Sequence, residues 1–415
     1  MHLCVEFRTD KTDKTDKTKL FITIALCFLV ALMEGLDLQA PGIAAHGMSA
    51  DFGLDKLEMG WVFSVGVLGM LPGAFVGGRL ADRYGRKKVL VFSVAVFGIF
   101  SLVTTVAWSF GALLFARFLT GVGLGASLPN LIALASEAAG ERMRGTAVSL
   151  MYCGVPLGAA LAAAIGLLDF GAGWTLVFYV GGAVPLVIVP LLLIFLPDVY
   201  RQAISATTTI EVPSTQAILV EDGALKKTLL LWVSFFFTLM VTYILINWLP
   251  SILIGQGFKP NEASIVVLAM QLGAAVGTLM LGIATDRLPI WAMSALVYGG
   301  ILVSLACLTL ATSLPTMIGA GFLAGIFTTG GQCVLYALAP QFYPANGRAT
   351  GTGAAVAVGR IGAMTGPLVV GKMMVLGAGA GGVMLASAPG IVLAAISLLY
   401  LSSLKKRPEL SASVV

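Results

Sequence analysis

The chain has 415 residues, of which 58% are hydrophobic and 11% are charged, and its mean hydropathy is +0.97. This composition excludes an ordinary soluble globular protein and predicts an integral membrane protein. The formal net charge of +5 requires no nucleic-acid partner, because Lys and Arg gather in short loops beside apolar segments, where cytoplasmic loops carry them.

Residues 1–19 contain the repeat TDKTDKTDKTK, which is polar and shows no apolar periodicity. A low-complexity segment of this kind predicts a disordered cytoplasmic leader. The charge-free runs that follow are repeatedly long enough to cross about 30 Å of hydrocarbon as helices. They predict an all-α fold with twelve spans, in which residues 228–258 form one helix plus a loop and residues 290–344 form two helices that separate near Ser313.

The first span, residues 26–45, is interrupted by two acids, Glu34 and Asp37. Residues three apart share one helical face, and a charge inside a bilayer is costly unless it is paired, hydrated or neutralised. Two such carboxylates are suited to take up a proton on one side of the membrane and to release it on the other. The alternative is that both acids merely neutralise the intramembrane arginines Arg117 and Arg360.

Residues 77–88, GGRLADRYGRKK, form the most specific motif of the chain. Its glycines allow close helix approach, and its basic cluster favours the cytoplasmic side. The motif resembles the loop between the second and third helices of the major facilitator superfamily, and this resemblance implies a conformational latch between the two halves. The implied latch residues are Gly78, Asp82, Arg83, Gly85 and Arg86, with Asp286 and Arg287 as counterparts in the second half. A plain positively charged loop is the alternative.

Arg117 begins the stretch RFLTGVGLGASLPN, residues 117–130, within the fourth span. An arginine inside a bilayer costs roughly 2.5–3.5 kcal/mol on insertion scales. We therefore expect Arg117 to face the bundle interior and to pair with a partner that the sequence does not identify. A role in function or proton relay is expected for this arginine, whereas Gly121 and Gly125 form a small-residue face suited to plain helix packing.

The two halves of the chain repeat at an offset of 204 residues, which predicts two six-helix pseudo-repeats. The offset superimposes Gly73 on Gly277, Asp82 on Asp286, Arg83 on Arg287, Arg144 on Arg348 and Gly158 on Gly362. The predicted bundles are residues 20–197 and 228–404, joined by a polar cytoplasmic linker, residues 198–227, and followed by a tail, residues 405–415. Because basic residues fall on alternate loops, both termini are predicted to be cytoplasmic.

Other chemistries find little support in the sequence. GAGAGG, residues 377–382, fits G-x-G-x-x-G, but no strand precedes it, and no G-x-x-x-x-G-K-[ST] loop for ATP occurs. The sequence contains two histidines and no Ser-His-Asp or metal-ligating constellation, so it offers few side chains for enzyme catalysis. The sequence predicts no enzyme, cofactor or metal site, and it leaves an ion gradient as the driving force.

Three features narrow the resemblance: EGLD at residues 34–37, the intact loop after the second span, and GRIGAMTGP at residues 359–367. Together they resemble the aromatic acid:proton symporter family, whose members begin the first helix with Asp-Gly-x-Asp; Glu34 replaces the first Asp here. EGLDLQAPGIAA and RGTAVSLMYCGVPLGAALAA are most similar to bacterial 3-(3-hydroxyphenyl)propionate transporters. The resemblance implies a monomeric protein of the bacterial inner (cytoplasmic) membrane that imports an aromatic carboxylate with a proton, with Glu34 and Asp37 carrying the coupling.

The carboxylate of such a substrate needs a cation near the membrane midplane. Arg360 and Arg117 are the two candidates, and Arg360 is favoured because it lies in the second half of the chain. The side chains able to bind a phenol hydroxyl are Asn247, Gln271, Gln332, Tyr336 and Tyr152, each with ordinary helix packing as the alternative. A proton-driven drug exporter of the same superfamily would share the loop motif and would not need Arg360, and a receptor would need a cytoplasmic signalling domain.

Overall fold

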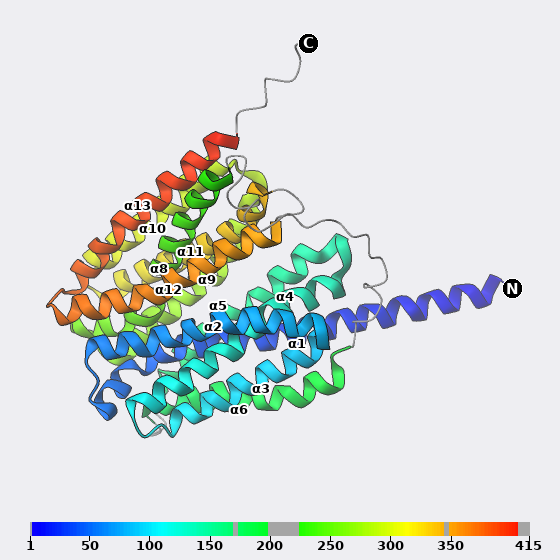
Figure 1. The fold of residues 1–415 in the computed structure, drawn as a ribbon, viewed down its shortest axis with the longest axis horizontal. Coiled ribbons are helices and arrows are strands. Elements are labelled where there is room, and N and C mark those ends of the chain that lie inside the picture. Colours follow the sequence, from blue (N-terminus) through cyan, green and yellow to red (C-terminus); the bar gives the residue numbers. More distant parts are fainter. Residues whose placement is uncertain (1, 169–172, 198–223, 344–347, 406–415) are drawn as a thin grey trace, which may run out of the picture. The chain divides into compact units, whose positions relative to one another are not determined.

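A computed structural model describes residues 2–168, 173–197, 224–343 and 348–405 (Figure 1). The helices of the first half are α1 (His2–Phe52), α2 (Lys56–Tyr84), α3 (Arg86–Thr105), α4 (Phe110–Tyr152), α5 (Gly154–Ile165) and α6 (Leu176–Phe195). Those of the second half are α8 (Ala224–Gly255), α9 (Pro260–Arg287), α10 (Ile290–Leu310), α11 (Leu314–Leu338), α12 (Arg348–Val375) and α13 (Ala380–Lys405). Two 3₁₀ turns, η1 (Gly173–Thr175) and η2 (Ala339–Phe342), complete the regular elements of the described ranges.

Twelve helices in the described part of the chain are long and apolar enough to cross a membrane. The predicted all-α fold with twelve spans is therefore confirmed. The break between α10 and α11 also falls where the sequence placed it, with Ser313 as the N-cap of α11. Orientation in the membrane, with both termini on the cytoplasmic side, stays a prediction.

The disordered leader over residues 1–19 stays a prediction. α1 begins at His2, and its bounds include the TDK repeat. Most of the predicted linker, residues 198–223, and residues 406–415 of the predicted tail lie outside the described residues.

The helices form two compact units. Of the described residues, the first comprises 2–40, 68–159 and 175–197, and the second comprises 41–67, 160–168, 173–174, 224–343 and 348–405. In the first unit α3 packs against both α4 and α6 (Figure 1). In the second unit α8 packs against α12 and α13, and α9 packs against α11. The division into bundles at residues 197 and 228 stays a prediction.

The second unit includes the start of α2, which is fastened to α8 and α12. Ser64 Oγ donates a hydrogen bond to the main-chain oxygen of Met364 (2.7 Å), and Trp248 Nε1 donates one to the oxygen of Pro367 (3.0 Å). The ring of Phe63 meets the Trp248 ring edge-on, with a centroid distance of 5.1 Å. These three contacts, which we call the Pro367 clasp, join α2, α8 and α12 within this unit.

The predicted repeat is visible in the helix contacts of α2 with α4 and of α9 with α11. A Cβ added at Gly73 would overlap the carbonyl oxygen of Val122, and one added at Gly277 would overlap that of Ile326. Val122 and Ile326 are themselves related by the offset of 204 residues. Close approach of two backbones at a glycine is a common way for membrane helices to associate, and here the same approach occurs once in each unit.

The contacts of α1 with α5 and of α8 with α12 repeat in the same way. A Cβ at Gly158 would overlap the carbonyl oxygen of Leu32, and one at Gly362 would overlap that of Phe236, again at the same offset. Two independent pairs of equivalent contacts support a duplicated six-helix fold.

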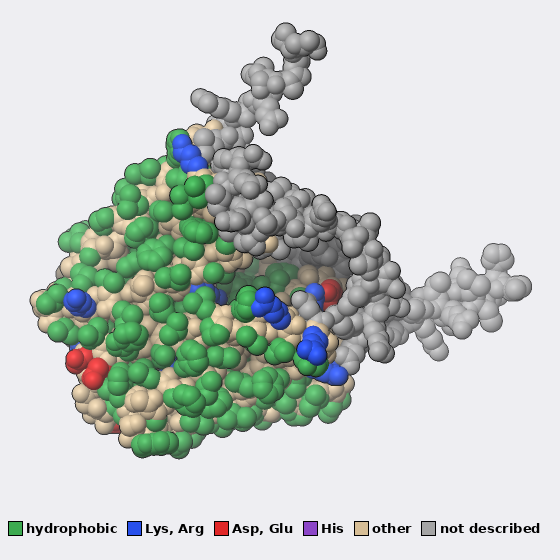
Figure 2. Space-filling model, viewed as in Figure 1, with side chains coloured by type: hydrophobic (Ala, Val, Ile, Leu, Met, Phe, Trp, Pro, Cys, Tyr) green, Lys and Arg blue, Asp and Glu red, His purple; other side chains and the backbone are tan. Residues whose placement is uncertain are grey.

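Hydrophobic side chains cover most of the face visible in Figure 2. Large apolar side chains are exposed along several spans, among them Phe92, Ile194 and Leu310. A soluble protein would not expose so much contiguous apolar surface, whereas lipid solvates it. The exposed surface therefore agrees with the membrane location that the hydropathy predicts.

Replacing Gly158 by Ala should destabilise the first unit, because the added methyl group would push α1 away from α5. Overpacking of this kind costs about 1–3 kcal/mol. The measurement is the thermal unfolding midpoint of the detergent-solubilised protein, which should fall by several degrees. Gly319→Ala on α11 is the matched control, because a Cβ there would meet no atom within 4 Å. An unchanged midpoint in Gly158→Ala would contradict the contact.

Candidate functional site

Glu34 and Asp37 on α1 and Arg117 on α4 are all buried in the first unit. Arg117 and Asp37 form an ion pair: Nη1 lies 3.3 Å from Oδ1 and 3.2 Å from Oδ2 of the carboxylate. Nη2 also donates to the main-chain oxygen of Asp37 (3.4 Å). The structure thus pairs Arg117 with one of the two acids that the alternative interpretation assigned to the intramembrane arginines, and it brings two of the predicted site residues together.

Two further helices complete the surroundings of this ion pair. Ser101 on α3 donates to Oδ1 of Asp37 (2.9 Å), and the guanidinium of Arg117 lies over the ring of Phe178 on α6, 5.3 Å from its centroid. Sequence reasoning missed both residues. Nε of Arg117 is buried and has no hydrogen-bond partner within the described structure, so the arginine is not fully saturated.

Glu34 has a different environment from Asp37. Its Oε2 accepts a hydrogen bond from Ser127 Oγ on α4 (3.2 Å). Both acids of α1 therefore contact α4, Asp37 through Arg117 and Glu34 through Ser127. No group of three or more His, Cys, Asp or Glu side chains that could hold a metal ion occurs among the residues that the structure describes.

Arg360, the favoured carboxylate partner, lies on α12 in the second unit. Its Nη1 donates to the phenol oxygen of Tyr243 on α8 (2.6 Å). Tyr243 is buried and was not predicted, because a tyrosine in an apolar span has no spacing signal that separates it from ordinary packing. The hydrogen bond fixes the guanidinium against α8.

The other polar candidates of the second unit gather on neighbouring helices. Gln332 Nε2 donates to the phenol oxygen of Tyr336 one turn later on α11 (2.9 Å), and the Tyr336 ring packs against Phe235 of α8 at a centroid distance of 5.7 Å. Asn247 Nδ2 donates to the main-chain oxygen of Tyr243 (2.9 Å). Gln271 is buried on α9. Tyr152 is the last residue of α4 and belongs to the first unit.

The loop predicted to act as a latch is a one-residue turn between α2 and α3. Gly85 has φ +95°, a left-handed conformation that favours glycine. Arg86 forms an ion pair with Glu137 of α4, which sequence reasoning did not include. Of the other predicted latch residues, Gly78 is partly buried and Arg83 and Arg287 are exposed, while the side chains of Asp82 and Asp286 lie outside the described part of the structure.

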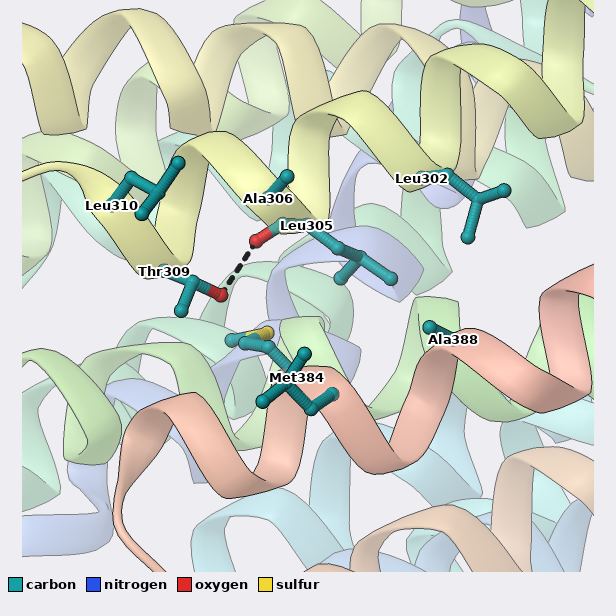
Figure 3. Close-up of a pocket in the computed structure, with 8 residues that line it drawn as sticks. Leu302, Leu305, Ala306, Thr309, Leu310, Met384 and Ala388 are labelled. Carbon is teal, nitrogen blue, oxygen red and sulfur yellow. Dashed lines mark hydrogen bonds between the residues drawn. The ribbon is translucent and has the colours of Figure 1, made fainter.

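An apolar groove of about 280 Å³ lies between α10 and α13 (Figure 3). Leu302, Leu305, Ala306, Leu310 and Met384 are among the residues that line it. The hydroxyl of Thr309 is turned back to the carbonyl of Leu305 (2.8 Å). None of the predicted site residues lines this groove, and its lining offers no partner for a carboxylate.

Removing one partner of a buried ion pair leaves the other charge uncompensated, at a cost of about 3–5 kcal/mol. Arg117→Met should therefore lower the thermal unfolding midpoint strongly. The double variant Arg117→Met with Asp37→Asn should recover much of the loss, because both charges are then removed. Equal midpoints for the single and double variants would show that the pair is not coupled.

Comparison with known proteins completes the description. The family model described as Major Facilitator Superfamily matches residues 27–293 and 231–414. A 3-(3-hydroxy-phenyl)propionate transporter from Escherichia coli (strain K12) is 59% identical over 94% of this chain and 96% of its own length. The 4-hydroxybenzoate transporter PcaK from Pseudomonas aeruginosa is 33% identical over 85% of this chain and 86% of its own length.

The fold is also that of solved structures. The crystal structure of a bacterial homologue of the human lysosomal transporter Spinster, in an inward-facing and unoccupied conformation, matches with a TM-score of 0.76. The match covers 95% of this chain and 99% of that chain at 18% identity, so it bears on the fold alone. Together, the twelve spans, the repeated helix contacts and the sequence matches establish that this chain belongs to the major facilitator superfamily.

Proposed function

We propose that this protein imports an aromatic carboxylate of the 3-(3-hydroxyphenyl)propionate type together with a proton. It is a membrane transporter rather than an enzyme, and its twelve spans together with its bacterial transporter relatives make it a multi-pass protein of the bacterial inner membrane. The identity of 59% with a transporter of that substrate carries the substrate assignment. We further propose a monomer with both termini in the cytoplasm.

The ion pair between Asp37 and Arg117 supports proton coupling. An anion that enters against an inside-negative potential loses about 2.3 kcal/mol per 100 mV, and one proton carried with it cancels its charge. Protonation of Asp37 would remove the negative charge that holds Arg117. Proton binding would thereby weaken the contact between α1 and α4, so that it is coupled to a movement of these helices. Glu34, one turn away on α1, is the proposed second proton site.

Arg360 is the proposed partner of the substrate carboxylate. Both terminal nitrogens of Arg117 are directed at Asp37, whereas Nη1 of Arg360 donates to the neutral phenol oxygen of Tyr243, which orients the guanidinium. Gln332, Tyr336, Asn247 and Gln271 are the proposed polar contacts of the phenol ring substituents. Tyr152 of the first unit is a further proposed polar contact of the substrate.

The loop after α2 is the proposed latch of the transport cycle. Gly78, Asp82, Arg83, Gly85 and Arg86 would act in the first half, and Asp286 and Arg287 in the second. The pairing of Arg86 with Glu137 adds a described contact that connects the loop to α4. Export of drugs was the other expectation from the sequence; the relatives named above are described as transporters of aromatic acids, and we do not propose export.

Glu34→Gln should abolish proton-driven accumulation of radiolabelled 3-(3-hydroxyphenyl)propionate in membrane vesicles, while the protein still inserts. The amide can accept the hydrogen bond from Ser127 but cannot ionise. Glu58→Gln is the matched control, because Glu58 accepts only a capping bond from the main chain of Asp55, which an amide also accepts. Wild-type accumulation in Glu34→Gln would remove Glu34 from the coupling mechanism.

Tyr243→Phe should raise the KM for the aromatic acid roughly 2- to 10-fold, the effect of losing a hydrogen bond worth about 0.5–1.5 kcal/mol. The cause is a less well-oriented Arg360. Tyr400→Phe is the control, since it removes a phenol oxygen from another cationic partner, Lys226 (2.5 Å). The measurement is initial uptake against substrate concentration, and an unchanged KM in Tyr243→Phe would count against Arg360 as the carboxylate partner.

A further inference from the structure

The hydroxyl of Ser101 has two acceptors on two different helices. Its Oγ lies 2.9 Å from Oδ1 of Asp37 on α1 and 3.3 Å from the main-chain oxygen of Phe178 on α6. Ser101 itself, on α3, is fully buried. A hydroxyl has one hydrogen to donate and rotates to suit its surroundings, so it can serve only one of these acceptors fully at a time.

The two acceptors correspond to the two protonation states of Asp37. An ionised carboxylate only accepts hydrogen bonds, so the Ser101 hydroxyl donates to it. A protonated carboxylic acid has a hydrogen of its own to donate. Ser101 Oγ can accept that hydrogen if its own hydrogen turns to the Phe178 carbonyl. In both states of Asp37 the Ser101 hydroxyl and the Asp37 carboxyl group then remain hydrogen-bonded to each other, so neither is left as a buried unsatisfied group, which otherwise is costly.

α6 is shaped to allow this exchange. Gly181 lies one turn after Phe178, and a Cβ added there would stand 3.2 Å from Ser101 Oγ and 3.7 Å from Oδ1 of Asp37. The absence of a side chain at Gly181 therefore leaves room for the hydroxyl and the carboxylate. The same helix places the Phe178 ring under Arg117, so α6 contributes an acceptor, a ring and free space around one ion pair.

The charges around Asp37 are few. Glu34, Asp37 and Arg117 are the charged side chains that are fully buried among the described residues. α5 and α6 contain no charged residue, and the basic residues of α3, Arg86 to Lys88, stand at its start, far along the helix from Ser101. Ser127 serves Glu34 from α4, but its second acceptor is Leu124 on its own helix (2.8 Å), an ordinary local contact.

We propose that Ser101 is a positioning residue for proton exchange at Asp37, its hydroxyl turning from Asp37 to the Phe178 carbonyl when Asp37 takes up a proton and back when the proton leaves. Ser101 keeps its own hydrogen throughout, and the transported proton enters and leaves Asp37. The inference rests on the proposed proton coupling and adds α3 and α6 to the coupling machinery.

The experiment compares net uptake with exchange in vesicles that contain equal amounts of inserted protein. Net uptake driven by a proton gradient requires Asp37 to release its proton in every cycle, whereas exchange of labelled for unlabelled substrate shuttles the loaded, protonated protein. Ser101→Ala should lower the ratio of net uptake to exchange by about tenfold, the effect of losing a hydrogen bond to a charged group. Exchange itself should change little.

Three variants complete the test. Ser101→Thr keeps the hydroxyl and should restore the ratio. Ser93→Ala is the matched control on α3, because the Ser93 hydroxyl donates to Val89 of its own helix (2.7 Å), and its ratio should stay at the wild-type value. Gly181→Ala should lower the ratio by crowding the hydroxyl, and it tests the proposal independently if Ser101→Ala does not fold.

A wild-type ratio in both Ser101→Ala and Gly181→Ala would overturn the proposal. So would an equal loss of net uptake and exchange in Ser101→Ala that Ser101→Thr does not rescue, because that result assigns Ser101 a packing role. If the proposed function is wrong, the result is different: net uptake by the wild-type protein would then not depend on the proton gradient.

Discussion

Burial of a carboxylate and a guanidinium inside an apolar helix bundle is the constraint on which the first unit depends. Either charge alone would be costly in a bilayer. The packing of α1 against α4 lowers that cost, because it places Nη1 of Arg117 3.2 Å from Oδ2 of Asp37. The hydroxyl of Ser101 and the ring of Phe178 add the remaining contacts. These helices and side chains enclose the ion pair. A proton is small enough to reach Asp37 and change its charge while the helix bundle stays closed.

The internal repeat preserves helix packing and the charged loop residues Asp82 and Arg83, but not the charges inside the spans. At the offset of 204 residues, Glu34 corresponds to Thr238, Asp37 to Val241 and Arg117 to Gly321, while Arg360 corresponds back to Pro156. The glycine contacts recur in both units, yet these four ionisable residues do not. Duplication thus accounts for the architecture, and later divergence of a few side chains accounts for the proposed division between a coupling half and a substrate half.

Much of the fold could be predicted because hydropathy and helix length are averaged over about twenty residues, which single substitutions barely affect. The repeat was equally accessible, since glycines such as Gly158 and Gly362 occur at one offset. The sequence did not decide which acid pairs with Arg117, because pairing depends on how α1 and α4 are rotated against each other. Ser101 and Tyr243 were missed for a related reason: in an apolar run, one hydroxyl carries no periodic signal.

The Pro367 clasp makes the fluorescence of Trp248 depend on the packing of α2 against α8 and α12. Trp248 is almost fully buried, with its indole N–H held by Pro367 and its ring edge-on to Phe63. The emission of an indole shifts to longer wavelength when water reaches it. Any step that separates α2 from α8 and α12 would wet this indole, and any step that keeps them together would leave it dry. In a chain whose other five tryptophans are replaced, the emission of Trp248 would therefore distinguish the clasped from the parted form of this unit, without a label and without substrate.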